Sequence, residues 1–177
     1  VGTNSLTANT TASYNTALGK DALLSATTGG FNVAVGTLAL EELTTAVDNT
    51  AVGHEAGTAI TTGAENTAIG TESLKTVTTA SYSTAVGHSA LRVATSGGFN
   101  TAVGRDAGVA VSTASGLVLV GERAGNAMTA GGNNTAVGQL SLYATTTGTN
   151  NVAVGTSAAD SITTGISNTA VGKDSLT

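Results

Sequence analysis

Carboxylates recur at a fixed interval in this sequence, and one pair has a spacing that catalysis can use. Glu55 and Glu72 are one 17-residue interval apart. If coils of that length stack as parallel strands do, the two side chains lie about 5 Å apart, which is also the separation of the carboxylates in a retaining glycosidase. No aromatic platform or hydrophobic pocket accompanies them in the sequence. We therefore interpret both as residues of a solvated face, and we predict no catalytic residue and no enzymatic activity.

The two histidines, His54 and His88, raise the question of a metal site. They are two 17-residue intervals apart, so stacked coils would separate them by about 10 Å, too far to share one metal ion. Lys20, Arg105 and Lys173 take the same place in other repeats, which indicates that this place faces water. We predict two surface histidines, no metal site and no cofactor.

Four of the five aromatic residues share one place in the repeat and form two pairs on adjacent coils, Tyr14 with Phe31 and Tyr82 with Phe99. Rings stacked one coil apart stabilise a solenoid, so we favour stacking or packing against a neighbouring chain. Exposed rings would instead suit contacts with a receptor or a sugar, and that alternative stays open. The fifth, Tyr143, shares its place with charged residues and is a weaker contact candidate.

A 17-residue repeat positions all of these side chains. Its unit reads N-T-A-V-G-x-x-A-L-x-x-Φ-T-T-G-x-x, where Φ is usually apolar, and we number these places 1 to 17. The six Lys and Arg and the eleven Asp and Glu all fall at positions 6, 7, 10, 11 or 17. Since stacked repeats place each position in one row, the rows without charge must be buried or packed. We treat residues 1–177 as a single continuous array of about ten coils.

Composition excludes several classes of function. The net charge is −5 and the few cations are scattered, so we predict no nucleic-acid partner. The absence of Cys excludes disulfides and thiolate metal sites. No apolar run approaches the ~20 residues of a membrane helix, so we expect no membrane insertion in this segment. Val1 and Thr177 both lie inside repeats, so we expect the chain to be a segment of a longer fibre.

The repeat length predicts an all-β fold. A pair of helices needs about 33 residues per repeat, whereas two short strands and two turns fit a 17-residue unit. Residues at positions 2 and 4 share one face of a strand, and apolar residues at positions 9 and 12 suggest the inward side of a second strand. We therefore predict a parallel β-roll with two short strands per coil. Its expected core row at position 4 consists of Leu18, Val35, Val52, Ile69, Val86, Val103, Val120, Val137, Val154 and Val171.

Two further rows have predicted structural roles. Glycine at position 5 is expected to adopt a positive φ at a corner where a Cβ would clash. These corner glycines are Gly19, Gly36, Gly53, Gly70, Gly87, Gly104, Gly121, Gly138, Gly155 and Gly172. Asparagine at position 1 either forms a hydrogen-bonded ladder between coils or merely suits a turn, and we favour the ladder. Its members are Asn15, Asn32, Asn49, Asn66, Asn100, Asn134, Asn151 and Asn168.

The N-T-A-V-G-x-x-A-L unit resembles the YadA-like head repeats of trimeric autotransporter adhesins and the related repeats of phage tail fibres. The resemblance covers the whole chain, although the adhesin repeat is usually slightly shorter than this 17-residue unit. It implies a left-handed β-roll, three chains associated about a fibre axis, and an extracellular place on a cell or virion surface. A thin coil also encloses few side chains, whereas ordering its backbone costs conformational entropy. Burial of further surface between chains would offset that cost, which favours association of several chains.

We expect a structural or adhesive fibre segment that acts as a homotrimer, with a host-surface receptor or glycan as an additional partner. A purely structural extracellular filament and an ice-binding solenoid are the alternatives. The Thr61-Thr62 type of doublet argues against ice binding, because neighbouring hydroxyls of an extended strand point to opposite faces. The sequence does not separate a bacterial adhesin from a phage tail fibre.

Overall fold

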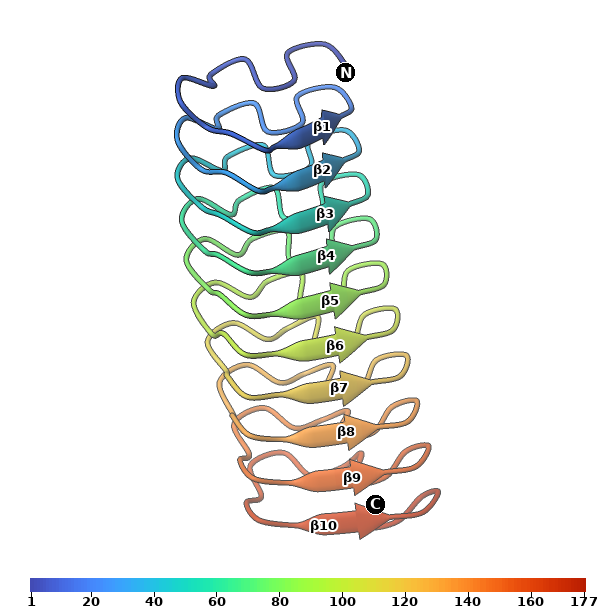
Figure 1. Cartoon of the computed structure of the whole chain (residues 1–177). Helices are drawn as coiled ribbons and strands as arrows, with labels where there is room; N and C mark the ends of the chain where they lie inside the picture. The colour runs from blue at the N-terminus through green and yellow to red at the C-terminus, as the bar shows by residue number, and fades with distance from the viewer.

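Ten short strands, one from each coil, stack into a single parallel sheet along the length of the molecule (Figure 1). The computed structural model describes residues 1–177 and contains no helix. The strands are β1 (Thr16–Leu18), β2 (Val33–Val35), β3 (Thr50–Val52), β4 (Thr67–Ile69), β5 (Thr84–Val86), β6 (Thr101–Val103), β7 (Val118–Val120), β8 (Thr135–Val137), β9 (Val152–Val154) and β10 (Thr169–Val171). Each strand pairs with the next one along the chain, and Thr50 lies opposite Thr67. The predicted parallel β-solenoid of 17-residue coils is confirmed.

Each coil contains one strand rather than the two that we predicted. The segment after the corner glycine is a series of turns, because residues at positions 7 and 9 adopt the left-handed conformation, as Asp21 (φ 56°) and Leu23 (φ 51°) do. Alternating left-handed residues cannot form an extended strand. The turns still stack, since the amide of Leu23 donates to the carbonyl of Ala39 at 3.1 Å. The wall opposite the sheet is therefore hydrogen-bonded from coil to coil without being a strand.

The interior is built from alanine on the sheet and from larger residues on the opposite wall. Ala51 and the other position-3 residues are the buried members of their strands. Leu40 at position 9 and Ile60 at position 12 face them and are fully buried, as predicted for those positions. The coil is thin, so leucine and isoleucine from one wall leave room for little more than a methyl group from the other.

The prediction that position 4 forms the core row is wrong, because the side chains at position 4 lie on the outer face of the sheet. Leu18, Val35, Val52, Ile69, Val86, Val103, Val120, Val137, Val154 and Val171 are all exposed or half-exposed. The period of two was correct, but its phase was reversed. A branched residue on the inner face of a strand would collide with the leucines of the opposite wall, and overpacking of this kind destabilises a core.

The coil of β7 supports this explanation, because a large residue on the sheet is accompanied there by glycines on the opposite wall. In β7 a leucine, Leu119, replaces the inward alanine, and it is fully buried. The neighbouring position-9 residues are then Gly108 and Gly125 instead of leucine. A Cβ added to Gly108 would lie 2.6 Å from a methyl carbon of Leu119, and one added to Gly125 would lie 2.8 Å from the other methyl carbon. The large side chain has moved from one wall to the other while the interior stays filled.

The corner glycines adopt the predicted positive φ. Gly87 has φ 136°, and a Cβ added there would lie 2.5 Å from the carbonyl oxygen of Gly104 in the next coil. Both the conformation and the close approach of two backbones therefore require glycine. The same positive φ occurs at Gly19, Gly36, Gly53, Gly70, Gly104, Gly121, Gly138, Gly155 and Gly172.

The asparagine ladder is also present. The side-chain oxygen of Asn32 accepts hydrogen bonds from the backbone amide of Asn49 at 2.9 Å and from its side-chain nitrogen at 3.2 Å. That nitrogen also donates to the carbonyl of Gly63 at 3.0 Å, and the side-chain oxygen of Asn49 accepts from the backbone amide of Asn66 in the next coil at 3.0 Å. Each buried asparagine thus connects its own coil to both neighbours. Ser83 and Leu117 take the place of asparagine in two coils.

Candidate functional site

Both histidines lie on the surface, as predicted. His54 and His88 follow the corner glycines of β3 and β5 and are exposed. His54 approaches a carboxylate, with its Nδ1 3.9 Å from an oxygen of Glu55. No group of three or more His, Cys, Asp or Glu side chains lies close enough to hold a metal ion.

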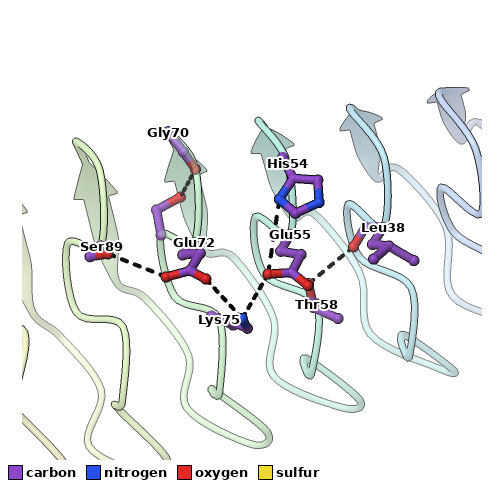
Figure 2. A network of polar contacts seen from close by, with 9 residues as sticks. Leu38, His54, Glu55, Thr58, Gly70, Glu72, Lys75 and Ser89 are labelled. Atoms are coloured by element: carbon purple, nitrogen blue, oxygen red, sulfur yellow. Dashed lines mark hydrogen bonds and ion pairs between the residues drawn. The ribbon is translucent and has the colours of Figure 1, made fainter.

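Glu55 and Glu72 form an ion triad with a lysine that the sequence reasoning did not connect to them (Figure 2). Lys75 Nζ lies 2.6 Å from an oxygen of Glu55 and 2.9 Å from an oxygen of Glu72. Glu55 and Glu72 occupy position 7 of adjacent coils, and Lys75 occupies position 10 of the same coil as Glu72. The repeat numbering could have predicted this ion triad, because stacked coils bring a cation at position 10 close to carboxylates at position 7.

The triad has the electrostatics of a structural ion pair rather than of a general acid. The hydrogen bond from Lys75 lowers the pKa of the Glu72 carboxyl below its ordinary value of 4.5. Hydrogen bonds to Glu55, and then to Glu72, raise the pKa of the Lys75 ammonium above 10.5. A glycosidase acid needs a carboxyl whose pKa is raised. The arrangement therefore holds two adjacent coils together and favours the ionised form of Glu72.

A second charged cluster joins the coils that follow β6, β7 and β8. Arg105 donates to Asp106 at 2.9 Å and also contacts Glu122 in the next coil. Gln139 donates to the other oxygen of Glu122 at 3.0 Å. These contacts, that with Gln139 first and that with Arg105 next, lower the pKa of Glu122. These exposed charged side chains again link neighbouring coils.

The aromatic pairs are both stacked and exposed. The ring centroids of Tyr14 and Phe31 are 4.8 Å apart, and those of Tyr82 and Phe99 are 4.9 Å apart, each with an interplanar angle of 14°. The predicted stacking is thus confirmed. All four side chains are more than half exposed, so the rings are also open to contacts from outside the chain. Tyr143 lies at the surface by itself.

The outer face of the ten-stranded sheet is a regular surface that continues from β1 to β10. It carries one row of valine, leucine and isoleucine at position 4 and one row of threonine and valine at position 2. No charged residue occurs in either row. No hydrogen bond within the chain uses the hydroxyls of Thr50, Thr67 or Thr84 in the second row. This sheet face, together with the aromatic pairs, is the candidate functional surface.

The structure has no helix long and apolar enough to cross a membrane. No pocket is present in the chain. No family model matches the sequence, and comparisons with curated proteins and with solved structures found no match.

Proposed function

We propose that the chain is a structural or adhesive segment of an extracellular fibre, forming the shaft or head of a homotrimer on a cell or virion surface. The observation that carries this proposal is the sheet face, which presents an uncharged, largely apolar surface over all ten strands. Large exposed apolar patches on soluble proteins mark interaction surfaces. A fibre role is also supported by the unbroken stacking, since coils spaced by about 4.8 Å make an extended rod.

The partner that best fits the sheet face is another copy of the same chain. Its rows repeat at every coil, and only a surface with the same repeat can match them over their full length. Val86 and Val137, three coils apart, would make equivalent contacts in such an assembly. Closed rings of identical subunits satisfy this kind of matching with cyclic symmetry. Three copies around one axis would cover the apolar rows of all three chains.

Light scattering on the purified chain tests the oligomeric state directly. We expect a species with three times the mass of the 17.0 kDa chain. Val86→Lys combined with Val137→Lys places charges on the sheet face and should shift the protein towards monomer. Thr79→Lys with Thr147→Lys is the matched control, because both threonines are exposed away from the sheet. A monodisperse monomer of the unmodified chain at micromolar concentration would contradict the proposal.

Ice binding is a second candidate that one observation favours. Seven of the ten position-2 residues are threonine, and they form a straight outward row on the sheet. By contrast, the Thr61 hydroxyl of the threonine doublet donates to the carbonyl of Thr78 at 3.1 Å and is not free. A monomer with thermal hysteresis that Thr67→Tyr abolishes would favour ice binding over the fibre, because trimer formation would cover the same surface.

A further inference from the structure

Phe99 differs from Phe31, the second ring of the other stacked pair, in what lies beside its outer ring face. One face of its ring stacks on Tyr82. On the other side, position 17 of the next coil is Gly116, which has no side chain. The equivalent neighbour of Phe31 is Asp48. Phe99 is accordingly 66% exposed and Phe31 58% exposed.

The spacing of the coils leaves room for one further ring to stack on the uncovered face of Phe99. Rings at position 17 of adjacent coils lie 4.8 to 4.9 Å apart. A ring held at the level of Gly116 would therefore stack on Phe99 as Phe99 stacks on Tyr82. The coil after Gly116 supplies a polar group, since Asn133 Oδ1 would lie 2.5 Å from a Cβ added to Gly116. Asn133 is exposed, and its side chain makes no hydrogen bond within the chain.

We propose that Phe99, supported by Tyr82 and flanked by Gly116 and Asn133, binds one neutral pyranose ring of a glycan. A pyranose has an apolar face of C–H groups that packs on an aromatic ring, and hydroxyl groups at its edge that pair with an amide. This inference rests on the proposed adhesive function and names its ligand class.

The surroundings select a neutral sugar over other ligands. Glu65 lies at position 17 one coil before Tyr82, and no Lys or Arg occurs at position 17 in any coil. An anionic sugar or a phosphate would find no cation in this row. An aromatic anchor residue of a protein partner usually fills a well-packed, desolvated pocket, and the chain has none. An exposed ring with an adjacent amide is better suited to a polyol.

The platform is accessible in the proposed trimer. Its row also contains the exposed carboxylates Asp48 and Glu65, which we expect to stay in water. The sheet face that we assign to trimer contacts is formed by positions 2 and 4, whereas the aromatic row precedes the strands at position 17. Sugar binding and trimer formation therefore use different side chains.

Saturation-transfer NMR on the full chain tests the proposal, with methyl glycosides of glucose, galactose and mannose and with N-acetylglucosamine as probes. We expect at least one probe to receive saturation from the protein, and we expect at least a fivefold loss of that signal in Phe99→Ala and in Gly116→Phe. The Gly116→Phe variant keeps Phe99 but covers its outer face with a third ring, and its Cβ makes the Asn133 amide, whose oxygen lies 2.5 Å from that position, rotate away. Gly116 has φ 72°, and aromatic residues already occupy this position with φ near 60° in Tyr82 and Phe99.

Ser167→Phe is the matched control, because Ser167 is also at position 17 with φ 56° but has no aromatic neighbour. It should retain the signal. Asp48→Gly combined with Glu65→Asn reproduces the Phe99, Gly116 and Asn133 arrangement next to Phe31, and it should add a second site and roughly double the signal. Absence of binding by all four probes, binding that survives Phe99→Ala, or equal loss in Gly116→Phe and Ser167→Phe would overturn the proposal. So would preferential binding of tyrosine amide. If the chain is trimeric and no sugar binds, this inference fails while the proposed fibre function stands.

Discussion

Replacing Gly87 with alanine tests the packing of the coils at its most constrained point. Gly87 lies in the middle of the array with φ 136°, and the added Cβ would lie 2.5 Å from the oxygen and 2.7 Å from the carbon of the Gly104 carbonyl. Ordinary contact begins at 3.4 Å. The obstructing atoms belong to the backbone, so no side chain can rotate away. The two coils must separate at this corner, where Gly104 donates to Val86 at 2.8 Å.

The expected loss of stability has two sources. Holding alanine in a conformation that suits glycine costs about 1–3 kcal/mol. Stretching or breaking the adjacent hydrogen bond costs about 1 kcal/mol more. Together these give roughly 2–4 kcal/mol per chain, which corresponds to a Tm lower by roughly 4–16 °C for a chain of this size. In the proposed trimer all three chains carry the change at the same level.

Thermal unfolding followed by circular dichroism measures the effect, with two controls. Gly172→Ala introduces strain without the clash, since Gly172 has φ 118° and no atom within 4 Å of the added Cβ. His88→Ala alters the next residue, which is exposed. We expect Gly87→Ala to have the lowest Tm, Gly172→Ala an intermediate one and His88→Ala that of the unmodified chain. If His88→Ala unfolds the protein while Gly87→Ala is silent, our assignment of tight and exposed rows is wrong.

Three further predictions concern the interior and the surface ion triad. Asn49→Ala removes side-chain bonds to three coils and should lower the free energy of unfolding by about 2–4 kcal/mol in urea titrations; an equal loss in the exposed control Asn133→Ala would argue against the ladder. Leu119→Ala leaves a cavity beside two glycines that cannot fill it and should cost about 2–5 kcal/mol, and a neutral result would show that the coil collapses around the gap. Lys75→Met removes the partner that lowers the pKa of Glu72. In the wild type, the stabilisation that the ion pair gives the folded state is present above pH 4.5 and is lost as the pH falls through the folded-state pKa of Glu72. The variant should therefore lose less stability than wild type in an acid titration followed by fluorescence of an added dye, and identical acid sensitivity would exclude a role for the triad.

Much of the fold could be predicted because the repeat has a constant length. With a 17-residue coil and no insertion, equivalent residues must fall in rows, and hydrogen-bonded rows of this kind define a parallel solenoid. The corner role of Gly87 and the ladder role of Asn49 followed from what those residue types can do in a row. The inward direction of Leu40 followed from its recurrence at a position without charges. These features depend only on local chemistry repeated in register.

The wall of turns that replaces the expected second strand could not be predicted from composition. Leu23 suits a strand by its apolar side chain, yet its φ of 51° places it in a turn. A leucine in the left-handed conformation is unfavourable by itself. It is held there because the turn directs its side chain into the core and its amide to the carbonyl of Ala39. That stabilisation comes from the neighbouring coil and has no local signature.

The sequence by itself determined the period of the coil, the parallel stacking and the rows available to charge, because these follow from a strict repeat and from the cost of burying an unpaired charge. Only the tertiary structure decided which face of each strand points inward. Alternation shows that Ala51 and Val52 lie on opposite faces, but either could have been the core. The choice depends on how much volume Leu40 and Ile60 occupy from the opposite wall. The uncovered ring face of Phe99 was decided in the same way, since it depends on a side chain that the adjacent coil lacks at Gly116.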